Sequence, residues 1–180
     1  FWQDVHKFNA SAIGYVGELC RYLMDAPASD LERGHRVTKM IGNGMRPNIW
    51  SKFNTRFGVQ EILELYASSE GNVGFSNVFN FDNTVGFSPT PYAVIQFDKE
   101  KNEPVRDAKG KCMKVKKGEV GLLIGKITRR SPFDGYTDPE KNKAVMMQNV
   151  FKQGDAYFNT GDLVRDIGFR HAQFVDRLGD

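Results

Sequence analysis

The sequence has few cysteines, no long apolar run and almost balanced charges. Its two cysteines, Cys20 and Cys112, form no CxxC pair, which argues against a disulfide scaffold, a zinc site or a redox pair. Lys and Arg number 25 and Asp and Glu 22, and the net charge of +3 is too small to indicate a nucleic-acid partner. No apolar stretch approaches the roughly 20 residues of a membrane-spanning helix. The 14 phenylalanines among 180 residues still allow a well-packed core.

Common catalytic motifs are missing as well. His6, His35 and His171 stand alone, without the spacing of a hydrolase triad or a metalloprotease. Gly42-Asn43-Gly44 lacks the third glycine of a dinucleotide-binding fingerprint, and residues 121–126 are one residue short of a P-loop. If the chain binds a nucleotide, we therefore expect its main triphosphate cradle to lie elsewhere.

Hydrophobic periodicity and turn residues predict the elements of the chain. Pro47 suits the first position of a helix, and Gly58 suits the residue that closes it. Residues 159–162 are all turn formers and predict a turn. We expect helices over residues 12–24, 47–57 and 137–150, and strands over 36–41, 61–66, 93–97, 110–115, 121–128 and 172–176.

Residues 36–66 have the order strand, loop, helix, strand. Such a unit pairs its two strands in parallel through a right-handed crossover. The loop at Gly42-Asn43-Gly44 and the loop after Tyr66 then leave the same edge of the sheet, where open α/β sheets bind ligands. From about residue 85, short strands and turns dominate. The predicted fold class is α/β, with a parallel α/β unit followed by a mainly β subdomain.

The segment from Tyr66 to Asn72 is the first candidate site. An aromatic side chain at the end of a strand can offer a flat face to a planar base, and Ser69 can donate a hydrogen bond to a phosphate. Glu70 is the kind of oxygen ligand that Mg²⁺ prefers. The alternative is a polar turn with a solvated glutamate, and the spacing alone does not decide between the two.

The second candidate site combines Asp162 and Arg177. Asp162 can accept two hydrogen bonds from a ribose diol, and the preceding Gly161 allows a close approach. The guanidinium of Arg177 suits a ribose or a phosphate. The alternatives are an ordinary turn at Asp162 and a surface charge pair at Arg177.

One basic cluster remains. We expect it to be the solvated face of a hairpin; the alternative is a contact for anionic lipid headgroups. Its members are the lysines at positions 109, 111, 114, 116 and 117.

Four segments together resemble the adenylate-forming superfamily, which includes acyl-CoA synthetases, luciferases and peptide-synthetase adenylation domains. Within it, the resemblance is to the fatty acid transport proteins, also called very-long-chain acyl-CoA synthetases. The run Gly154-Asp-Ala-Tyr-Phe-Asn-Thr-Gly-Asp162 is its most specific part. The four segments are Tyr66–Asn72, Phe133–Asp138, Gly154–Asp162 and Phe174–Asp180.

The resemblance implies a role for each candidate residue in the first half of the chain. Tyr66 would stack on adenine, and Ser69 would contact the α-phosphate. Glu70 would bind Mg²⁺, and Gly42-Asn43-Gly44 would line the adenine and acyl pocket. The catalytic residues implied are therefore Ser69 and Glu70.

In the second half, the resemblance implies that Asp162 binds the ribose hydroxyls and that Arg177 contacts the ribose near a domain boundary. Residues 1–84 would be part of the α/β AMP-binding subdomain, and residues 85–178 would be a mainly β subdomain of the same domain. Residues 179–180 would begin the hinge to a carboxyl-terminal domain, with Gly179 as the hinge residue.

We accordingly expect the chain to be a piece of a longer protein, catalytically inactive by itself. The Ser/Thr/Gly-rich phosphate loop and the catalytic lysine of the family have no counterpart in the 180 residues. The fold implied is a fragment of the large amino-terminal domain of an adenylate-forming enzyme.

The resemblance implies that the intact protein is a long-chain or very-long-chain fatty acid–CoA ligase that uses ATP, Mg²⁺ and CoA. We expect it in the cytoplasm or on the cytoplasmic face of a membrane, with peripheral membrane contact as a further expectation. Two alternatives stay open: a fatty acid uptake protein with secondary ligase activity, and a nucleotide-binding module without catalysis. An adenylating enzyme for amino or aromatic acids is a further option.

Overall fold

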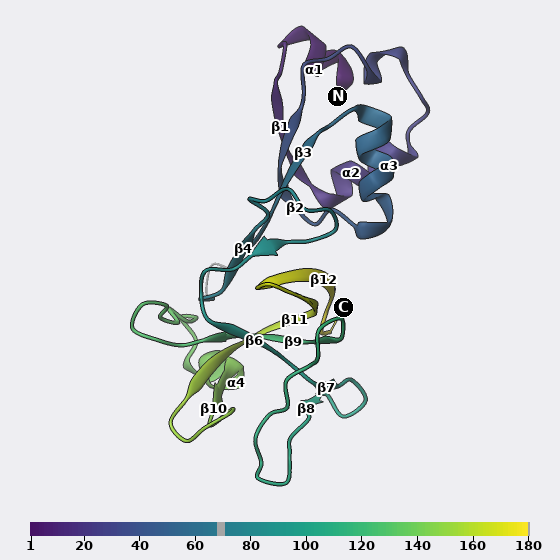
Figure 1. Cartoon of the computed structure of the whole chain (residues 1–180). Coiled ribbons are helices and arrows are strands. Elements are labelled where there is room, and N and C mark those ends of the chain that lie inside the picture. Colours follow the sequence, from purple (N-terminus) through teal and green to yellow (C-terminus); the bar gives the residue numbers. More distant parts are fainter. Residues whose placement is uncertain (68–70, 180) are drawn as a thin grey trace. The chain divides into compact units, whose positions relative to one another are not determined.

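The structure is a computed structural model that describes residues 1–67 and 71–179. The chain divides into two compact units (Figure 1). The first holds residues 1–66 and 76–86, and the second holds residues 67–75 and the chain from residue 87 onward. Each unit has its own cluster of buried apolar side chains. The boundary expected at residue 84 and the hinge expected at Gly179 stay predictions.

The first unit is built on a parallel sheet. Strands β1, β2 and β3 lie in that order, with Met40 opposite both Ile13 and Ile62. The parallel pairing predicted for the strands of residues 36–66 is confirmed. The elements are α1 (Trp2–Lys7), β1 (Ala12–Val16), α2 (Gly17–Asp25), a 3₁₀ turn (Asp30–Glu32), β2 (Lys39–Asn43), α3 (Pro47–Phe57) and β3 (Glu61–Ala67).

Helix α3 follows the prediction closely. It begins with Pro47 at its first turn and ends at Gly58, whose φ of +71° is left-handed. Trp50, Phe53 and Phe57 repeat at helical spacing and are almost fully buried in the core of the first unit. Burial of this aromatic face, more than helix propensity, therefore stabilises α3.

The helix predicted over residues 12–24 is wrong in its first part. Residues Ala12–Val16 form β1 instead, since β2 supplies backbone hydrogen-bond partners along the whole segment. The helix starts only at Gly17, where a Cβ would lie 1.8 Å from the carbonyl oxygen of Gly44. That glycine is required because two connections of the sheet meet there.

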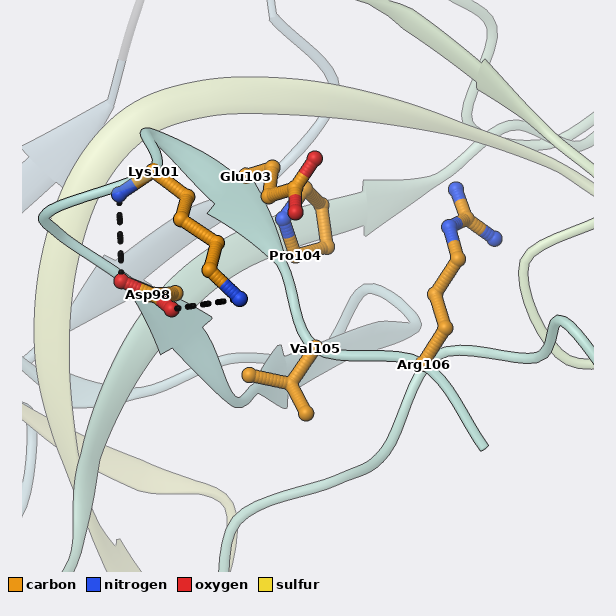
Figure 2. Close-up of a pocket in the computed structure, with 6 residues that line it drawn as sticks. All are labelled: Asp98, Lys101, Glu103, Pro104, Val105 and Arg106. Carbon is orange, nitrogen blue, oxygen red and sulfur yellow. Dashed lines mark hydrogen bonds and ion pairs between the residues drawn. The ribbon is translucent and has the colours of Figure 1, made fainter. Parts of the chain in front are cut away.

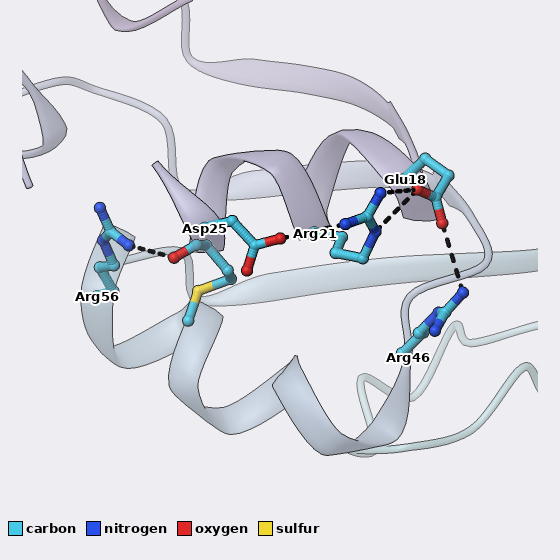
Figure 3. Close-up of polar contacts among 6 residues, drawn as sticks. Glu18, Arg21, Asp25, Arg46 and Arg56 are labelled. Atoms are coloured by element: carbon cyan, nitrogen blue, oxygen red, sulfur yellow. Dashed lines mark hydrogen bonds and ion pairs between the residues drawn. The ribbon is translucent and has the colours of Figure 1, made fainter. Parts of the chain in front are cut away.

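Polar contacts tie α2 to both ends of α3 (Figure 3). Glu18 pairs with Arg21 at 2.7 Å and with Arg46, the residue before α3, at 3.4 Å. Arg56 in the last turn of α3 donates to the carbonyl of Met24 at 2.7 Å. The ion pairs of Glu18 are exposed, so they orient the helices more than they stabilise them.

The second unit is mainly antiparallel β, as predicted for the second half of the chain. Its main sheet has the order β6, β9, β11, β12, and β10 also pairs with β11. Strands β7 and β8 pair with each other in a separate two-stranded sheet. The elements of the unit are β6 (Tyr92–Ile95), β7 (Phe97–Asp98), β8 (Glu103–Pro104), β9 (Val120–Lys126), α4 (Pro139–Val145), β10 (Met146–Gln148), β11 (Ala156–Gly168) and β12 (His171–Arg177). The two short strands β4 (Gly74–Ser76) and β5 (Gly86–Phe87) lie where the chain passes from one unit to the other.

Three predictions for the second unit need correction. The helix expected over residues 137–150 stops at Val145, because residues 146–148 pair with β11. Residues 110–115 form isolated bridges to Ile95 and Arg106 instead of a continuous strand. The turn expected at residues 159–162 lies inside β11 and is a bulge.

Candidate functional site

The carboxyl edge of the first sheet brings together four of the predicted site residues. Gly42 and Asn43 are the last residues of β2, and not loop residues as predicted, whereas Gly44 lies in the connection to α3. Tyr66 lies near the end of the neighbouring strand β3 and is half-buried. Gly42 pairs with Glu64 in parallel register, so the end of β2 and Tyr66 share one edge.

The close approach of β1 and β2 requires glycine at position 42. A Cβ there would lie 2.0 Å from the carbonyl oxygen of Tyr15, which is backbone and cannot move away cheaply. Gly44 adopts a left-handed φ of +79°, which favours glycine for a different reason. Both glycines of the predicted pocket loop thus have a backbone role of their own.

A buried carboxylate that the sequence analysis did not single out lies at the same edge. Glu64 is 3% exposed and accepts a hydrogen bond from the Tyr15 hydroxyl and from the backbone N–H groups of Gly44 and Met45. Burial raises the pKa of Glu64 to about 7, although the Tyr15 hydroxyl and the two amides lower it. Burial and the nearby Glu64 also raise the pKa of Tyr15. The available signal was an acidic residue two positions after Ile62, on the inward face of a strand.

The bulge in β11 presents Asp162. Its register against β9 shifts between Asn159 and Leu163, and Gly161 takes a left-handed φ of +75°. The hydroxyl of Thr160 donates to the Leu123 carbonyl at 2.8 Å and accepts from the backbone N–H of Asp162 at 3.1 Å. The bulge is therefore fixed by hydrogen bonds, and Asp162 is 8% exposed at its end.

The structure brings the second predicted pair together. Asp162 and Arg177 are direct cross-strand partners of β11 and β12, and the Arg177 Nε lies 3.9 Å from a carboxylate oxygen of Asp162. The Arg177 side chain is 59% exposed, so this ion pair stabilises the fold little. The backbone N–H of Leu178 donates to the Gly161 carbonyl at 2.8 Å and fixes the end of β12 to the bulge.

Ser69 and Glu70 lie outside the described residues. Among residues 1–67 and 71–179, no three His, Cys, Asp or Glu side chains lie together in a way that could bind a metal ion. Just after that gap, Asn72 is 9% exposed and donates to the carbonyls of Lys126 at 2.9 Å and Ser131 at 3.1 Å. These two hydrogen bonds fix Asn72, the last residue of the candidate segment that begins at Tyr66, within the second unit.

The segment after β7 carries the basic cluster and a surface pocket. Figure 2 shows that Lys101 contacts Asp98 through its backbone N–H, at 3.1 Å, and through its ammonium group, at 3.8 Å. Of the clustered lysines, Lys111 donates to the Asn149 carbonyl, and Lys114 lies over the Phe151 ring. The pocket contains none of the predicted nucleotide-binding residues; it is lined by Asp98, Lys101, Glu103, Pro104, Val105 and Arg106.

No protein-family model matches the chain. Solved structures share its fold over 98% of its length. They include ATP-bound MatB from Rhodopseudomonas palustris, at TM-score 0.67 and 18% identity, and a benzoate CoA ligase from Burkholderia xenovorans, at TM-score 0.61 and 18% identity. The chain covers 33% of each. The mixed α/β fold is that of the amino-terminal domain of adenylate-forming enzymes, as predicted.

Curated relatives match the whole chain. It is 48% identical over 180 residues to the medium/long-chain-fatty-acid–CoA ligase FadD6 of Mycobacterium tuberculosis. It is 46% identical to long-chain fatty acid transport protein 2 of rat and 41% identical to long-chain fatty acid transport protein 3 of human. The chain spans 30% of the length of the first two and 27% of the third. The predicted resemblance to fatty acid transport proteins and acyl-CoA synthetases is confirmed.

Proposed function

We propose that the intact protein containing this chain is an ATP-dependent long-chain fatty acid–CoA ligase. The observation that carries this proposal is the 48% identity along the whole chain to a protein named as a fatty-acid–CoA ligase. The shared fold with ATP-bound MatB supports ATP as a substrate.

The proposed reaction has two steps. The fatty acid carboxylate attacks the α-phosphorus of ATP, forming a mixed anhydride with AMP and releasing pyrophosphate. The thiol of CoA then attacks the acyl carbon and releases AMP. Such chemistry depends mainly on positioning and on electrostatic stabilisation of the phosphates.

In this proposal, Asp162 binds the ribose hydroxyls and Tyr66 stacks on adenine. The bulge supports the first role, because the Asp162 backbone is already fixed by its hydrogen bond to the Thr160 hydroxyl when the ribose arrives. Arg177, opposite Asp162, would contact the same ribose. Gly42-Asn43-Gly44 would line the adenine and acyl pocket, and Gly179 would serve as the hinge.

Ser69 is proposed to contact the α-phosphate, and Glu70 is proposed as the Mg²⁺ ligand. Since both lie outside the described residues, these roles rest on the resemblance and on the preference of Mg²⁺ for carboxylate oxygen. When bound, the metal would offset the negative charge that shifts onto the departing pyrophosphate.

Fatty-acid-dependent ATP–pyrophosphate exchange on the full-length protein tests the proposal. We expect exchange that requires the fatty acid and varies with its chain length. Glu70→Ala should slow ATP–pyrophosphate exchange strongly and leave the free energy of unfolding nearly unchanged. The control is Glu140→Ala, at an exposed glutamate of α4, which should change neither quantity. If no acid supports exchange in a folded protein that binds ATP, the ligase proposal fails.

A second candidate function is fatty acid uptake, with the ligase secondary. The identity of 46% and 41% to proteins named as long-chain fatty acid transport proteins favours it. Uptake by cells that express Glu70→Ala discriminates between the two. Uptake that survives in that variant supports transport, whereas its loss together with exchange supports the ligase. A nucleotide-binding module without catalysis would bind ATP and show neither activity.

Peripheral membrane contact and a location at the cytoplasmic face of a membrane remain part of the proposal. Within the described residues, every helix is too short or too polar to cross a bilayer. The basic cluster offers the only sequence feature that we assign to lipid headgroups. Co-sedimentation of the full-length protein with anionic and neutral vesicles is the corresponding test.

A further inference from the structure

Two strands and one connection of the first unit meet at one buried carboxylate. Glu64 comes from β3, the Tyr15 hydroxyl that donates to it comes from β1, and the Gly44 and Met45 amides come from the connection between β2 and α3. The Met45 N–H lies 3.1 Å from one carboxylate oxygen and 3.4 Å from the other. Glu64 therefore joins all three strands of the parallel sheet at their carboxyl ends.

The two amides depend on Glu64 for their hydrogen bonds. They belong to a connection at the start of α3, where backbone N–H groups have no partner within the helix ladder. Met45 is buried, so its N–H cannot be satisfied by bulk water if the carboxylate is removed. Removal of the acceptor should therefore move this backbone.

The surroundings leave the connection little freedom in other directions. The Gly44 carbonyl lies against Gly17, and Gly42 lies against the backbone of Tyr15, each too close for an added Cβ. A shift of the Gly44–Met45 backbone is thus a shift of the end of β2, where Gly42 and Asn43 lie.

We propose that Glu64 is the positioning residue that fixes the Gly44–Met45 backbone, and through it the pocket loop at Gly42-Asn43-Gly44. The pocket itself rests on the proposed ligase function, but the positioning of the backbone does not. In this proposal, Glu64 acts through the loop and does not itself bind a substrate.

Hydrogen exchange of the full-length protein tests the positioning directly, because the two amides are the groups that Glu64 binds. Glu64→Leu should speed exchange at Gly44 and Met45 by about tenfold or more. Glu64→Gln should stay near wild type, since its amide oxygen can accept from both N–H groups. Tyr15→Phe is the matched control: it removes the hydroxyl and leaves both amides paired. The proposal is overturned if hydrogen exchange at the two amides is unchanged in Glu64→Leu. It is also overturned if Glu64→Gln and Glu64→Leu speed that exchange equally.

Glu64→Asp provides a second test of the same prediction if Glu64→Leu does not fold. The shorter side chain withdraws the acceptor by one methylene, so exchange at the same two amides should again increase. Exchange at wild-type rates in a folded Glu64→Asp overturns the proposal.

Kinetics separate positioning from a loss of folded protein. We expect Glu64→Leu to raise the KM for ATP by about tenfold in the ATP–pyrophosphate exchange assay. Ile62→Ala, on the same face of β3, is the control and should lower the active fraction without changing that KM. An unchanged KM in Glu64→Leu overturns the link to the pocket. If the wild type shows no exchange activity, the ligase proposal fails, and the amide measurement still decides the role of Glu64.

Discussion

The first unit places its candidate residues at and just beyond the carboxyl ends of parallel strands, whereas the second places them within antiparallel strands. In the first unit, the connection that follows β2 is fixed by a side chain, Glu64, which accepts from the Gly44 and Met45 amides. In the second, Asp162 belongs to β11 and is fixed by the bulge, with Thr160 bonded to the Leu123 carbonyl.

The difference concerns what a substitution can disturb. A parallel strand end depends on side chains for its final conformation, so one residue such as Glu64 carries much of the geometry. An antiparallel bulge is enclosed by ladder hydrogen bonds on both sides, so the Thr160 hydroxyl is one of several groups that fix it. We therefore expect side-chain changes to act more strongly on the edge of the first unit and backbone changes to act on both.

The largest expected effects are in the two cores. Trp50→Ala should lower the free energy of unfolding of the first unit by about 3–5 kcal/mol, and Leu122→Ala that of the second by about 2–5 kcal/mol. Both side chains are buried, one in each apolar cluster. Hydrogen exchange resolved along the chain is the measurement, with each variant increasing exchange in its own unit. Equal increases in both units for either variant would contradict separate cores.

Glycine substitutions give the next largest effects and differ in cause. Gly42→Ala inserts a Cβ 2.0 Å from the Tyr15 carbonyl oxygen, so β1 and β2 must separate, at a cost of about 2–3 kcal/mol. At Gly161 a Cβ would meet no described atom within 4 Å, and only the left-handed φ opposes it, at about 1–2 kcal/mol. Chemical denaturation of the two variants should rank them in that order, and the reverse order would contradict the close approach of β1 and β2.

The pH dependence of stability should distinguish the first unit. Glu64 has its pKa raised from 4.5 to about 7, so its contribution is complete below about pH 4.5 and is lost as the pH rises through about 7. Once the pH is above the raised pKa, the loss should be on the order of 3 kcal/mol in that unit. Glu64→Gln does not titrate and should flatten the slope between about pH 5 and 8. Parallel slopes for the two proteins would show that Glu64 does not titrate in this range.

His35 provides the control of opposite sign in the same unit. Burial lowers the pKa of His35, which stacks on Trp2 at 4.8 Å between ring centroids. Its contribution is present above its ordinary value of 6.5 and is lost as the pH falls below that value. Glu64→Gln should leave this acid-side loss unchanged.

The sequence predicts best where the signal is local. Helix α3 follows from aromatic spacing between Pro47 and Gly58, and β3 from the apolar and aromatic residues on either side of Glu64. The strand at Ala12–Val16 could not be predicted from its own pattern, since its apolar residues also fit a helix and the deciding partner, β2, lies more than 20 residues away.

The same limit applies to the candidate site. Turn-forming residues at 159–162 fit a turn and a bulge equally well, and the pairing with β9 decides. Asp162 and Arg177 were each identified, but their pairing depends on the register of β11 and β12. Glu64 was missed because its role depends on three hydrogen-bond donors that only the fold brings to it. They are the Tyr15 hydroxyl and the Gly44 and Met45 amides.

The role of Asp162 as the ribose anchor is the central claim for this chain, and equilibrium ATP titration of the full-length protein tests it most directly. Asp162→Asn should weaken ATP binding about tenfold or more, because it removes a charged acceptor of the ribose hydroxyls. Asp166→Asn, four residues along the same strand, should leave the affinity unchanged. Equal affinities for wild type and Asp162→Asn would contradict the claim and leave residues 159–162 as a structural bulge.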